Sequence, residues 1–129
     1  TRNGELFAVD PNGRVLWKKH LGSAVNSSPA VTANGKIYVG TARGLFYCLT
    51  LKGNRKWVFR AGDNIKSSPV VDARGVIYFG SQDNHFYAVS QTGTALFRVD
   101  LVHDIDSSPA LGGGVAYIGG DADCLFAIE

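Results

Sequence analysis

Residues 67–80 read SSPVVDARGVIYFG, and the same pattern begins again at residues 27 and 107. Each copy starts with Ser-Ser-Pro, continues through a short apolar pair and a glycine-containing turn, and ends in an aromatic β run that closes on glycine. The copies therefore recur every 40 residues. A fixed period of this length is typical of repeat proteins, in which each unit packs against its neighbours.

A second apolar and aromatic run follows each copy after a polar loop. It reads LFAVD, FYCLT, FYAVS and LFAIE, at residues 6–10, 46–50, 86–90 and 125–129. A turn with a glycine then leads to a last strand with a large aromatic side chain at one fixed position. These glycines are Gly13, Gly53 and Gly93, and the aromatic residues are Trp17, Trp57 and Phe97. Since no segment has a helical period, each unit is predicted to be four short antiparallel strands.

Four strands in a 40-residue period favour a β-propeller over a β-solenoid or a sandwich. Turns such as Asn34-Gly35 and Arg74-Gly75 supply residues that tolerate positive φ, which tight hairpins need. The predicted fold is therefore all-β, built of propeller blades of four antiparallel strands.

The spacing Ala8-x-Asp10-x-x-Gly13-x-x-x-Trp17, followed by Ser-Ser-Pro and an Ile-Tyr-Val-Gly run, resembles the pyrroloquinoline-quinone-type, or quinoprotein-like, propeller repeat. That repeat occurs in quinoprotein alcohol dehydrogenases, in the periplasmic lipoprotein of the outer-membrane β-barrel assembly machinery, and in extracellular sensor regions of bacterial kinases. The resemblance covers nearly the whole chain. It implies that the aromatic residue docks onto the neighbouring blade, although Phe97 and Ser90 depart from the pattern. The implied docking residues are Gly13, Trp17, Gly53, Trp57, Gly93 and Phe97.

In this family each blade runs from an innermost strand A to an outermost strand D. With that order, residues 1–129 form a partial propeller of about three blades. Residues 1–26 supply strands C and D of a split blade, 27–66 and 67–106 are full blades, and 107–129 supply strands A to C of a last blade. Because propeller rings typically have at least four blades, this ring is incomplete, and we expect missing blades or self-association to cover the open faces.

The composition fits a globular protein, with 45% hydrophobic and 19% charged residues. A net charge of +2, with basic residues that we interpret as scattered, predicts no nucleic-acid partner, and no apolar run is long enough for a membrane span. The chain starts with Thr1, lacks Met and has no signal-peptide pattern, as a mature product or an excised piece would. Cys48 and Cys124 lack the spacing of a metal site, so we expect two buried, unpaired thiols.

We predict no catalytic, cofactor-binding or metal-binding residue in this chain. The Ser-Ser pairs recur in every unit, which favours a structural role, and none of the serines lies in a G-x-S-x-G motif. His20, His85 and His103 share no register, and Asp121-x-Asp123 lacks the further ligands of a calcium loop. Pyrroloquinoline quinone and calcium are expected only if the chain is a fragment of a quinone-dependent alcohol dehydrogenase, and the adjacent cysteine pair of those enzymes is absent.

Positions that differ between units are free to carry function, and most of them lie in the B–C loops and the D–A connections, which share one rim of the ring. The predicted rim site consists of Arg43, Asp63, Asn64, Lys66, Gln82, Asp83, Asn84, Asp104, Asp106, Asp121 and Asp123. The alternative is that these are ordinary solvated loop residues. We therefore expect a non-enzymatic scaffolding module, periplasmic or extracellular in a bacterium, that binds protein or peptide. The alternatives are a fragment of a quinone-dependent alcohol dehydrogenase and the sensor region of a membrane kinase.

Overall fold

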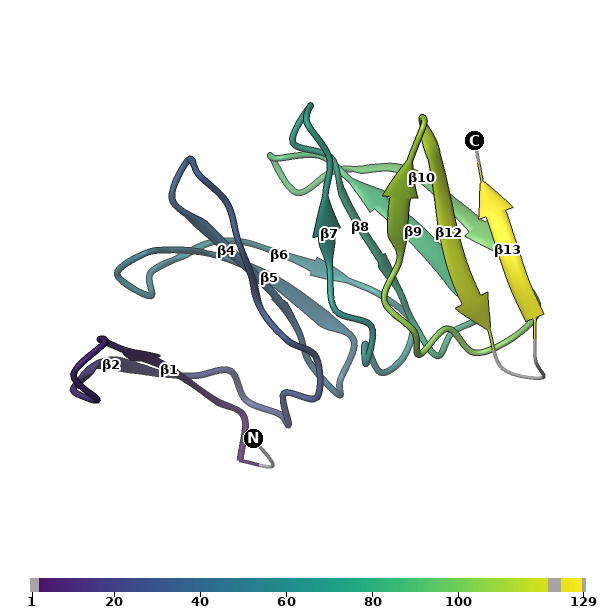
Figure 1. The fold of residues 1–129 in the computed structure, drawn as a ribbon. Helices are drawn as coiled ribbons and strands as arrows, with labels where there is room; N and C mark the ends of the chain where they lie inside the picture. Colours follow the sequence, from purple (N-terminus) through teal and green to yellow (C-terminus); the bar gives the residue numbers. More distant parts are fainter. Residues whose placement is uncertain (1–2, 121–123, 129) are drawn as a thin grey trace.

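The computed structural model describes residues 3–120 and 124–128, which form β-strands and no helix. The strands make four antiparallel sheets that lie side by side along an arc, with the N-terminal sheet at one end and the C-terminal sheet at the other (Figure 1). The predicted all-β fold of four-stranded propeller blades is confirmed. The described residues contain no helix that could cross a membrane.

The strands of each sheet are hydrogen-bonded in sequence order. The first sheet consists of β1 (Glu5–Val9) and β2 (Val15–His20). The second consists of β3 (Ala30–Val31), β4 (Lys36–Gly40), β5 (Leu45–Thr50) and β6 (Arg55–Arg60). The third consists of β7 (Val70–Val71), β8 (Ile77–Gly80), β9 (His85–Val89) and β10 (Ala95–Asp100). The fourth consists of β11 (Ala110–Gly112), β12 (Val115–Gly120) and β13 (Cys124–Ile128).

The two four-stranded sheets lie within residues 27–66 and 67–106. In each of them, strands A to D of the blade are the four strands in chain order. The division of the chain into two full and two split blades stays a prediction.

Strands B and C of the middle sheets are buried on both faces, which explains their continuous apolar runs. In β4, Tyr38 packs toward the third sheet, in a cluster with Phe79 and Tyr87. Its neighbours Ile37 and Val39 pack toward the first sheet. Because successive side chains of a strand point to opposite faces, one aromatic run supplies the core of two blade interfaces.

An irregularity between strands C and D sets the position of the aromatic residue in strand D. The register shifts between Ala8 and Val9, again between Cys48 and Leu49, and once more within β10 before Phe97. One extra residue in strand D at this point bends the strand and redirects the side chain that follows. This residue is Leu16, Lys56 or Leu96.

Candidate functional site

Two tryptophan side chains join a sheet to the sheet that follows it. The indole Nε1 of Trp17 donates a hydrogen bond to the carbonyl oxygen of Leu51 at 2.8 Å. Trp57 donates the equivalent bond to the carbonyl oxygen of Gln91, also at 2.8 Å. Each bond reaches 34 residues along the chain, from strand D of one blade to the C–D turn of the next.

The indole rings lie against the glycines of those turns. A Cβ atom at Gly53 would lie 3.0 Å from Cε3 of Trp17, and one at Gly93 would lie 2.7 Å from Cδ2 of Trp57. A side chain at either glycine would have to displace a ring. Gly13 has the same left-handed backbone, with φ +85°, but no atom of the described residues lies within 4 Å of a Cβ atom there.

Phe97 keeps only part of the tryptophan's contacts. The centroid of its ring lies 6.5 Å from the ring centroids of Tyr78 and Phe86, which belong to the same sheet. Trp57 makes the equivalent contacts in the preceding sheet, with Tyr38 and Phe46. A phenyl ring has no N–H to donate, and the side chain of Phe97 is exposed.

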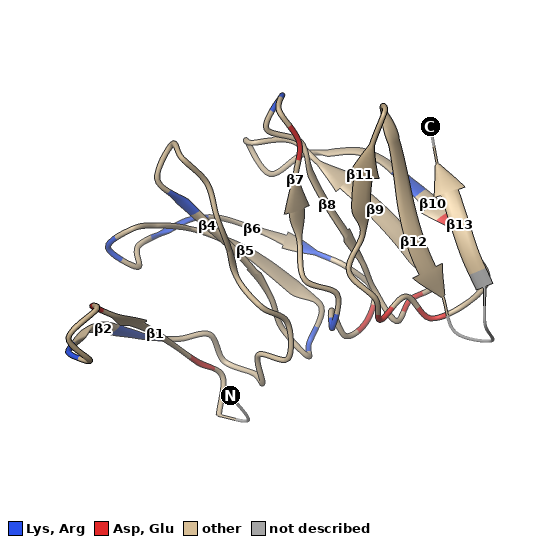
Figure 2. Cartoon of the chain, in the orientation of Figure 1, with Lys and Arg blue, Asp and Glu red and all other residues tan. Residues whose placement is uncertain are grey.

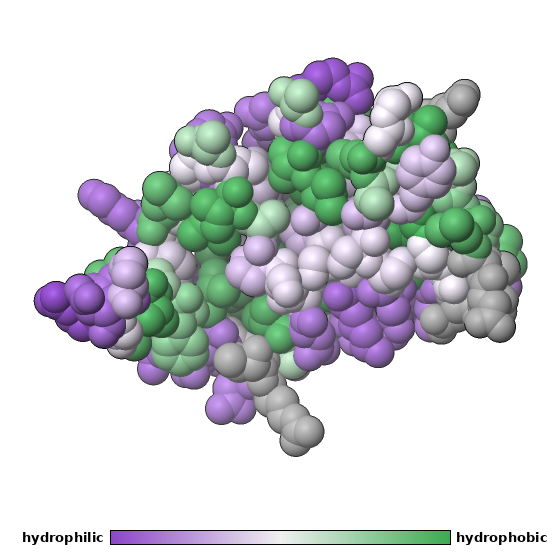
Figure 3. Space-filling view, viewed as in Figure 1, coloured by the Kyte–Doolittle hydropathy of each residue, from purple (hydrophilic) through white to green (hydrophobic). Residues whose placement is uncertain are grey.

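The opposite end of the sheets carries the predicted site. We call this end the loop rim: the B–C loops 41–44 and 81–84 together with the D–A connections 60–66 and 100–106. Hydrophilic residues gather along this edge in the space-filling view (Figure 3). Acidic and basic segments lie side by side there in the cartoon (Figure 2). The chain path therefore places the B–C loops and the D–A connections at the same end of the sheets.

Main-chain hydrogen bonds fix the rim loops to one another. The Gln82 amide donates to the carbonyl of Asn64 at 2.9 Å, which ties the B–C loop of one blade to the preceding D–A connection. The amides of Ile65 and Ile105 donate to the carbonyls of Thr41 and Ser81 at 3.0 and 3.1 Å, within their own units. The rim is a braced surface rather than a set of free loops.

Three predicted site residues meet on this surface. The amide Nε2 of Gln82 donates to Oδ1 of Asp106 at 3.1 Å, and the ammonium of Lys66 lies 3.7 Å from Oδ2 of the same carboxylate. The three side chains come from three different loops. Lys66 and Asp106 are both partly exposed, so the pair contributes little to stability and leaves polar atoms for a partner.

Asp83 has a structural role in the rim. Its Oδ2 accepts hydrogen bonds from the amide of Gly62 at 2.8 Å and from the hydroxyl of Tyr87, and its Oδ1 accepts one from the amide of His85 at 3.0 Å. Burial alone would raise the pKa of Asp83, but these donors outweigh it and lower the pKa. Burial, followed by the bond to the carboxylate, raises the pKa of Tyr87 to about 12.

Asn84 also serves the loop conformation. Asn84 has a φ of +70°, in the left-handed region where Asn is among the tolerated residues, and its carbonyl accepts the amide of Leu101 at 2.8 Å. Gly44 takes the equivalent position, with φ +76° and its carbonyl bonded to Ala61. Oδ1 of Asn64 is buried without a hydrogen-bond partner among the described residues.

The remaining predicted residues are more available. Arg43 and Asp63 are exposed, and Asp104 is half-buried. The carboxylate of Asp63 accepts the amide of Asn64 at 2.7 Å, whereas the guanidinium of Arg43 and the carboxylate of Asp104 have no hydrogen bond or ion pair within residues 3–120 and 124–128. Asp121 and Asp123 lie outside the described residues.

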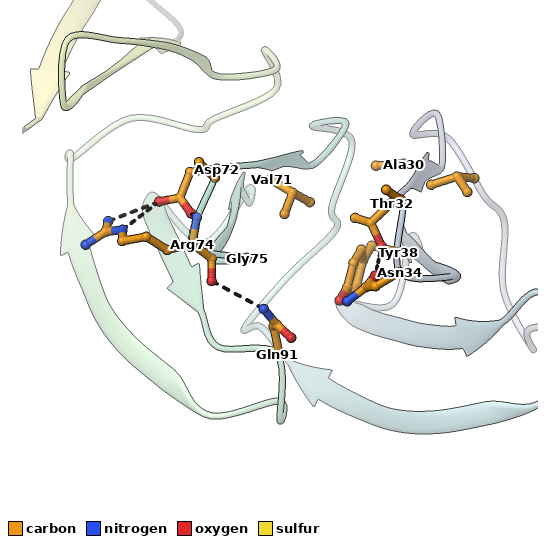
Figure 4. Close-up of a pocket in the computed structure, with 12 residues that line it drawn as sticks. Ala30, Thr32, Asn34, Tyr38, Val71, Asp72, Arg74, Gly75 and Gln91 are labelled. Carbon is orange, nitrogen blue, oxygen red and sulfur yellow. Dashed lines mark hydrogen bonds and ion pairs between the residues drawn. The ribbon is translucent and has the colours of Figure 1, made fainter.

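A pocket that the sequence analysis missed lies at the other end of the sheets, between the A–B turns of the two full blades (Figure 4). It encloses about 510 Å³. On one wall, the Asp72 carboxylate accepts hydrogen bonds from the Arg74 guanidinium at 3.0 Å and the Tyr78 hydroxyl at 3.0 Å. Burial alone would raise the pKa of Asp72, but donors from Val76, Arg74 and Tyr78 lower it. The difference between Thr32 and Asp72 at one repeat position could have indicated this cluster.

The described residues do not fit the quinone cofactor or a metal. Cys48 is buried in β5, far along the chain from Cys124, so no adjacent cysteine pair exists. No three His, Cys, Asp or Glu side chains of the described segments lie close enough to hold a metal ion together. Burial raises the pKa of the Cys48 thiol, which disfavours the reactive thiolate. The absence of a cofactor stays a prediction.

The basic residues are not scattered, as the sequence analysis assumed. Residues 11–62 contain nine basic and no acidic side chains, whereas residues 63–129 contain nine acidic and three basic ones. The prediction of scattered basic residues is therefore wrong: the two signs of charge divide between two parts of the chain. In Figure 2 the basic segments lie mainly on the first two sheets, and the acidic segments of the rim lie below the third and fourth.

Comparison with solved structures identifies proteins of similar fold. BamB from Moraxella catarrhalis shares 25% sequence identity with the chain at a TM-score of 0.85, covering 99% of this chain and 41% of BamB. The computationally designed Ika8 protein, at 13% identity, superposes with a TM-score of 0.82 over 98% of this chain and 40% of that one. A protein of unknown function from Bacteroides caccae, at 16% identity, gives 0.70 over 98% and 50%. The chain thus spans half or less of each of these proteins.

A search of curated protein sequences finds no match. The family model described as outer membrane protein assembly factor BamB matches residues 2–129. Since this match covers nearly the whole sequence and the BamB fold superposes on all four sheets, the chain belongs to the BamB-like family of pyrroloquinoline-quinone-type propeller proteins.

Proposed function

We propose that this chain is part of a non-enzymatic, extracytoplasmic scaffold that binds a protein or peptide through its loop rim. The BamB-like fold supports a protein-interaction scaffold in general terms. The family name, outer membrane protein assembly factor, suggests a protein involved in that assembly as the partner, and a periplasmic location.

The observation that carries the proposal is the meeting of Lys66, Gln82 and Asp106 on a rigid frame. Interaction surfaces need polar groups held in place before the partner arrives, because ordering them on binding would cost affinity. Main-chain bonds brace the loops that carry these groups. The groups also differ between repeat units, so the scaffold does not account for their identity.

Arg43 and Asp104 belong to the same loop rim and carry charged groups that have no ion pair in the described segments. Exposed charges at the edge of an interface chiefly set the association rate and partner choice. We therefore assign recognition to Arg43, Asp104, Lys66 and Asp106. Asp83 and Asn84 hold the loops in shape.

The test uses the full-length protein with a photo-crosslinking amino acid at position 43 or 104, and at exposed Thr92 on the opposite end as the control. A single protein partner should be captured from positions 43 and 104 but not from 92. The purified partner is then titrated against R43E and, as the matched control, R98E. We expect R43E to weaken binding roughly tenfold and R98E to leave it unchanged. Equal capture from position 92, or equal loss in both variants, would refute the rim assignment.

A further inference from the structure

The full blade 27–66 carries a set of cations that the next blade lacks. Every basic residue in this blade corresponds to a neutral or acidic residue 40 positions later. The basic residues are Lys36, Arg43, Lys52, Arg55, Lys56, Arg60 and Lys66, and their counterparts are Val76, Asp83, Thr92, Ala95, Leu96, Asp100 and Asp106. Because both blades have the same sheet order, the fold does not require these cations.

Four of these residues gather at the end of the blade opposite the loop rim. Lys36 begins β4 and pairs with Thr50 at the end of β5. The chain then turns, with the Thr50 amide bonded to the carbonyl of Asn54, and enters β6 at Arg55. Lys52 lies in that turn, and Lys56 is the extra residue of the irregularity that follows. We call Lys36, Lys52, Arg55 and Lys56 the basic turn end. It forms the blue segments at the start of β4 and on the β5–β6 hairpin in Figure 2.

The charges of the basic turn end are not neutralised within the described part of the chain. None of the four side chains forms a salt bridge there, in contrast to Arg14 and Lys18, which pair with Asp10 and Glu5. Lys52, Arg55 and Lys56 are exposed. Since residues 11–62 include no acidic side chain, the field of this region is positive.

Apolar side chains accompany the cations. Leu51, at the tip of the hairpin, is 56% exposed, and its Cδ1 would lie 3.6 Å from a Cβ atom at Gly35 in the adjacent A–B turn. The exposed Val15 and Leu16 belong to β2, which the Trp17–Leu51 hydrogen bond holds beside this hairpin. Protruding turns with lysine, arginine and aliphatic side chains match an interfacial membrane contact, in which aliphatic groups enter the headgroup region and cations meet lipid phosphates.

The same features disfavour nucleic acid. Sequence-tolerant binding of single strands depends on exposed aromatic rings for base stacking. The two tryptophans nearest to this surface, Trp17 and Trp57, are both engaged in blade docking.

We propose that the basic turn end of blade 27–66 binds the surface of an anionic lipid bilayer. In this orientation the loop rim, at the opposite end of the sheets, points away from the membrane and stays accessible. The proposal concerns a different surface and a different ligand from the proposed protein partner, so either can fail without the other.

The experiment measures co-sedimentation of the full-length protein, without any lipid attached to it, with vesicles of phosphatidylglycerol and phosphatidylcholine, and with phosphatidylcholine alone. The test variant is K52T/R55A/K56Q, whose first two changes introduce the residues of the next blade. The control R43Q/K66Q/R98Q removes the same number of charges elsewhere. Circular dichroism checks that both variants are folded.

We expect binding only to the anionic vesicles, weakening with salt, and a partition coefficient lower in the test variant by on the order of a hundredfold. The partition coefficient of the control variant should fall less than about tenfold. L51S should weaken binding severalfold without changing its salt dependence. The proposal is overturned by equal loss in test and control variants, by equal binding to both vesicle types, or by tighter binding to duplex DNA or polyglutamate than to the anionic vesicles.

Discussion

Gly13, Gly53 and Gly93 share one backbone conformation but not one environment. Their φ values are +85°, +84° and +86°, so any L-residue would be similarly strained at all three. Only Gly53 and Gly93 have an indole ring within reach of a Cβ atom. A comparison of alanine variants therefore separates the backbone requirement from the docking contact.

G93A should destabilise the protein more than G13A. We expect about 1 kcal/mol from backbone strain in both variants, and about 1–3 kcal/mol more in G93A, because its new methyl group collides with Trp57. Urea unfolding followed by tryptophan fluorescence measures the difference. An equal loss of unfolding free energy in G13A and G93A would mean that the indole of Trp57 moves aside without cost and that its contact with Gly93 does not stabilise the protein.

The Asp83 carboxylate should make stability depend on acid pH. Its pKa is lowered in the folded protein, so its contribution is present above the unfolded value of about 4 and is lost as pH falls through the folded value. D83N should therefore cost about 1–2 kcal/mol at neutral pH and progressively less below about pH 4. Urea unfolding at several pH values checks this, with D104N as a control because that carboxylate has no hydrogen bond in the described segments. A D83N deficit that persists unchanged at low pH would contradict the assignment.

At the scale of elements, the strands followed from the repeat, whereas the contacts between loops did not. Short apolar and aromatic runs bounded by glycine turns specify β4, β5 and β6, because both signals are local properties of the sequence. The Gln82–Asp106 contact joins two loops 24 residues apart, and its geometry depends on blade twist. Likewise, Asp83 appeared to be a free rim charge, since the residues that would donate to it could not be identified without the path of the D–A connection.

The D–A connection between β10 and β11 holds a strained residue. Val102 has a φ of +69° and is 74% exposed, so it adopts a left-handed conformation that β-branched residues disfavour and gains little from packing. Gly22 occupies the equivalent position two units earlier, with φ +81°. V102G should therefore stabilise the protein by about 1 kcal/mol, the relief of strain exceeding the entropy cost of glycine. Thermal unfolding measures this, and V102A, which keeps a Cβ atom, should gain much less. A lower Tm in V102G than in the unchanged protein would contradict the claim that Val102 is strained.

At the scale of the whole molecule, the repeat predicted stacked blades but concealed the charge asymmetry. Residues that agree at equivalent positions of the blades are those that the fold requires. Residues that differ there, such as the basic ones, are not required by the fold. Lys52, Arg55 and Lys56 stand where the next blade has Thr92, Ala95 and Leu96. These three belong to one hairpin, and the pairing of β4 with β5 places Lys36 beside them. The sequence shows these three as a short basic stretch at positions 52–56, but it does not show that Lys36 lies beside them, because that depends on the pairing of two strands.

The exposed faces of the end sheets give the last prediction. Phe46 and Phe86 are fully buried, at 0%, between neighbouring sheets, whereas Leu125 at the equivalent position of the last sheet is 76% exposed. Val9 in the first sheet is 56% exposed, and its counterparts Leu49 and Val89 are at 0%. Exposed apolar side chains at positions that are buried in the middle sheets favour association unless further blades cover them.

The 129-residue segment produced on its own should therefore self-associate through its end sheets, with an apparent mass in size-exclusion chromatography and light scattering that rises with concentration. L125K places a charge on the exposed face of β13 and should shift the equilibrium toward the monomer, whereas T92K, on an exposed turn, should not. Association should strengthen from low to room temperature, as apolar burial does. A folded segment that stays monomeric at all concentrations would show that single blade faces tolerate water, and the stacking requirement inferred from the 40-residue period would fail with it.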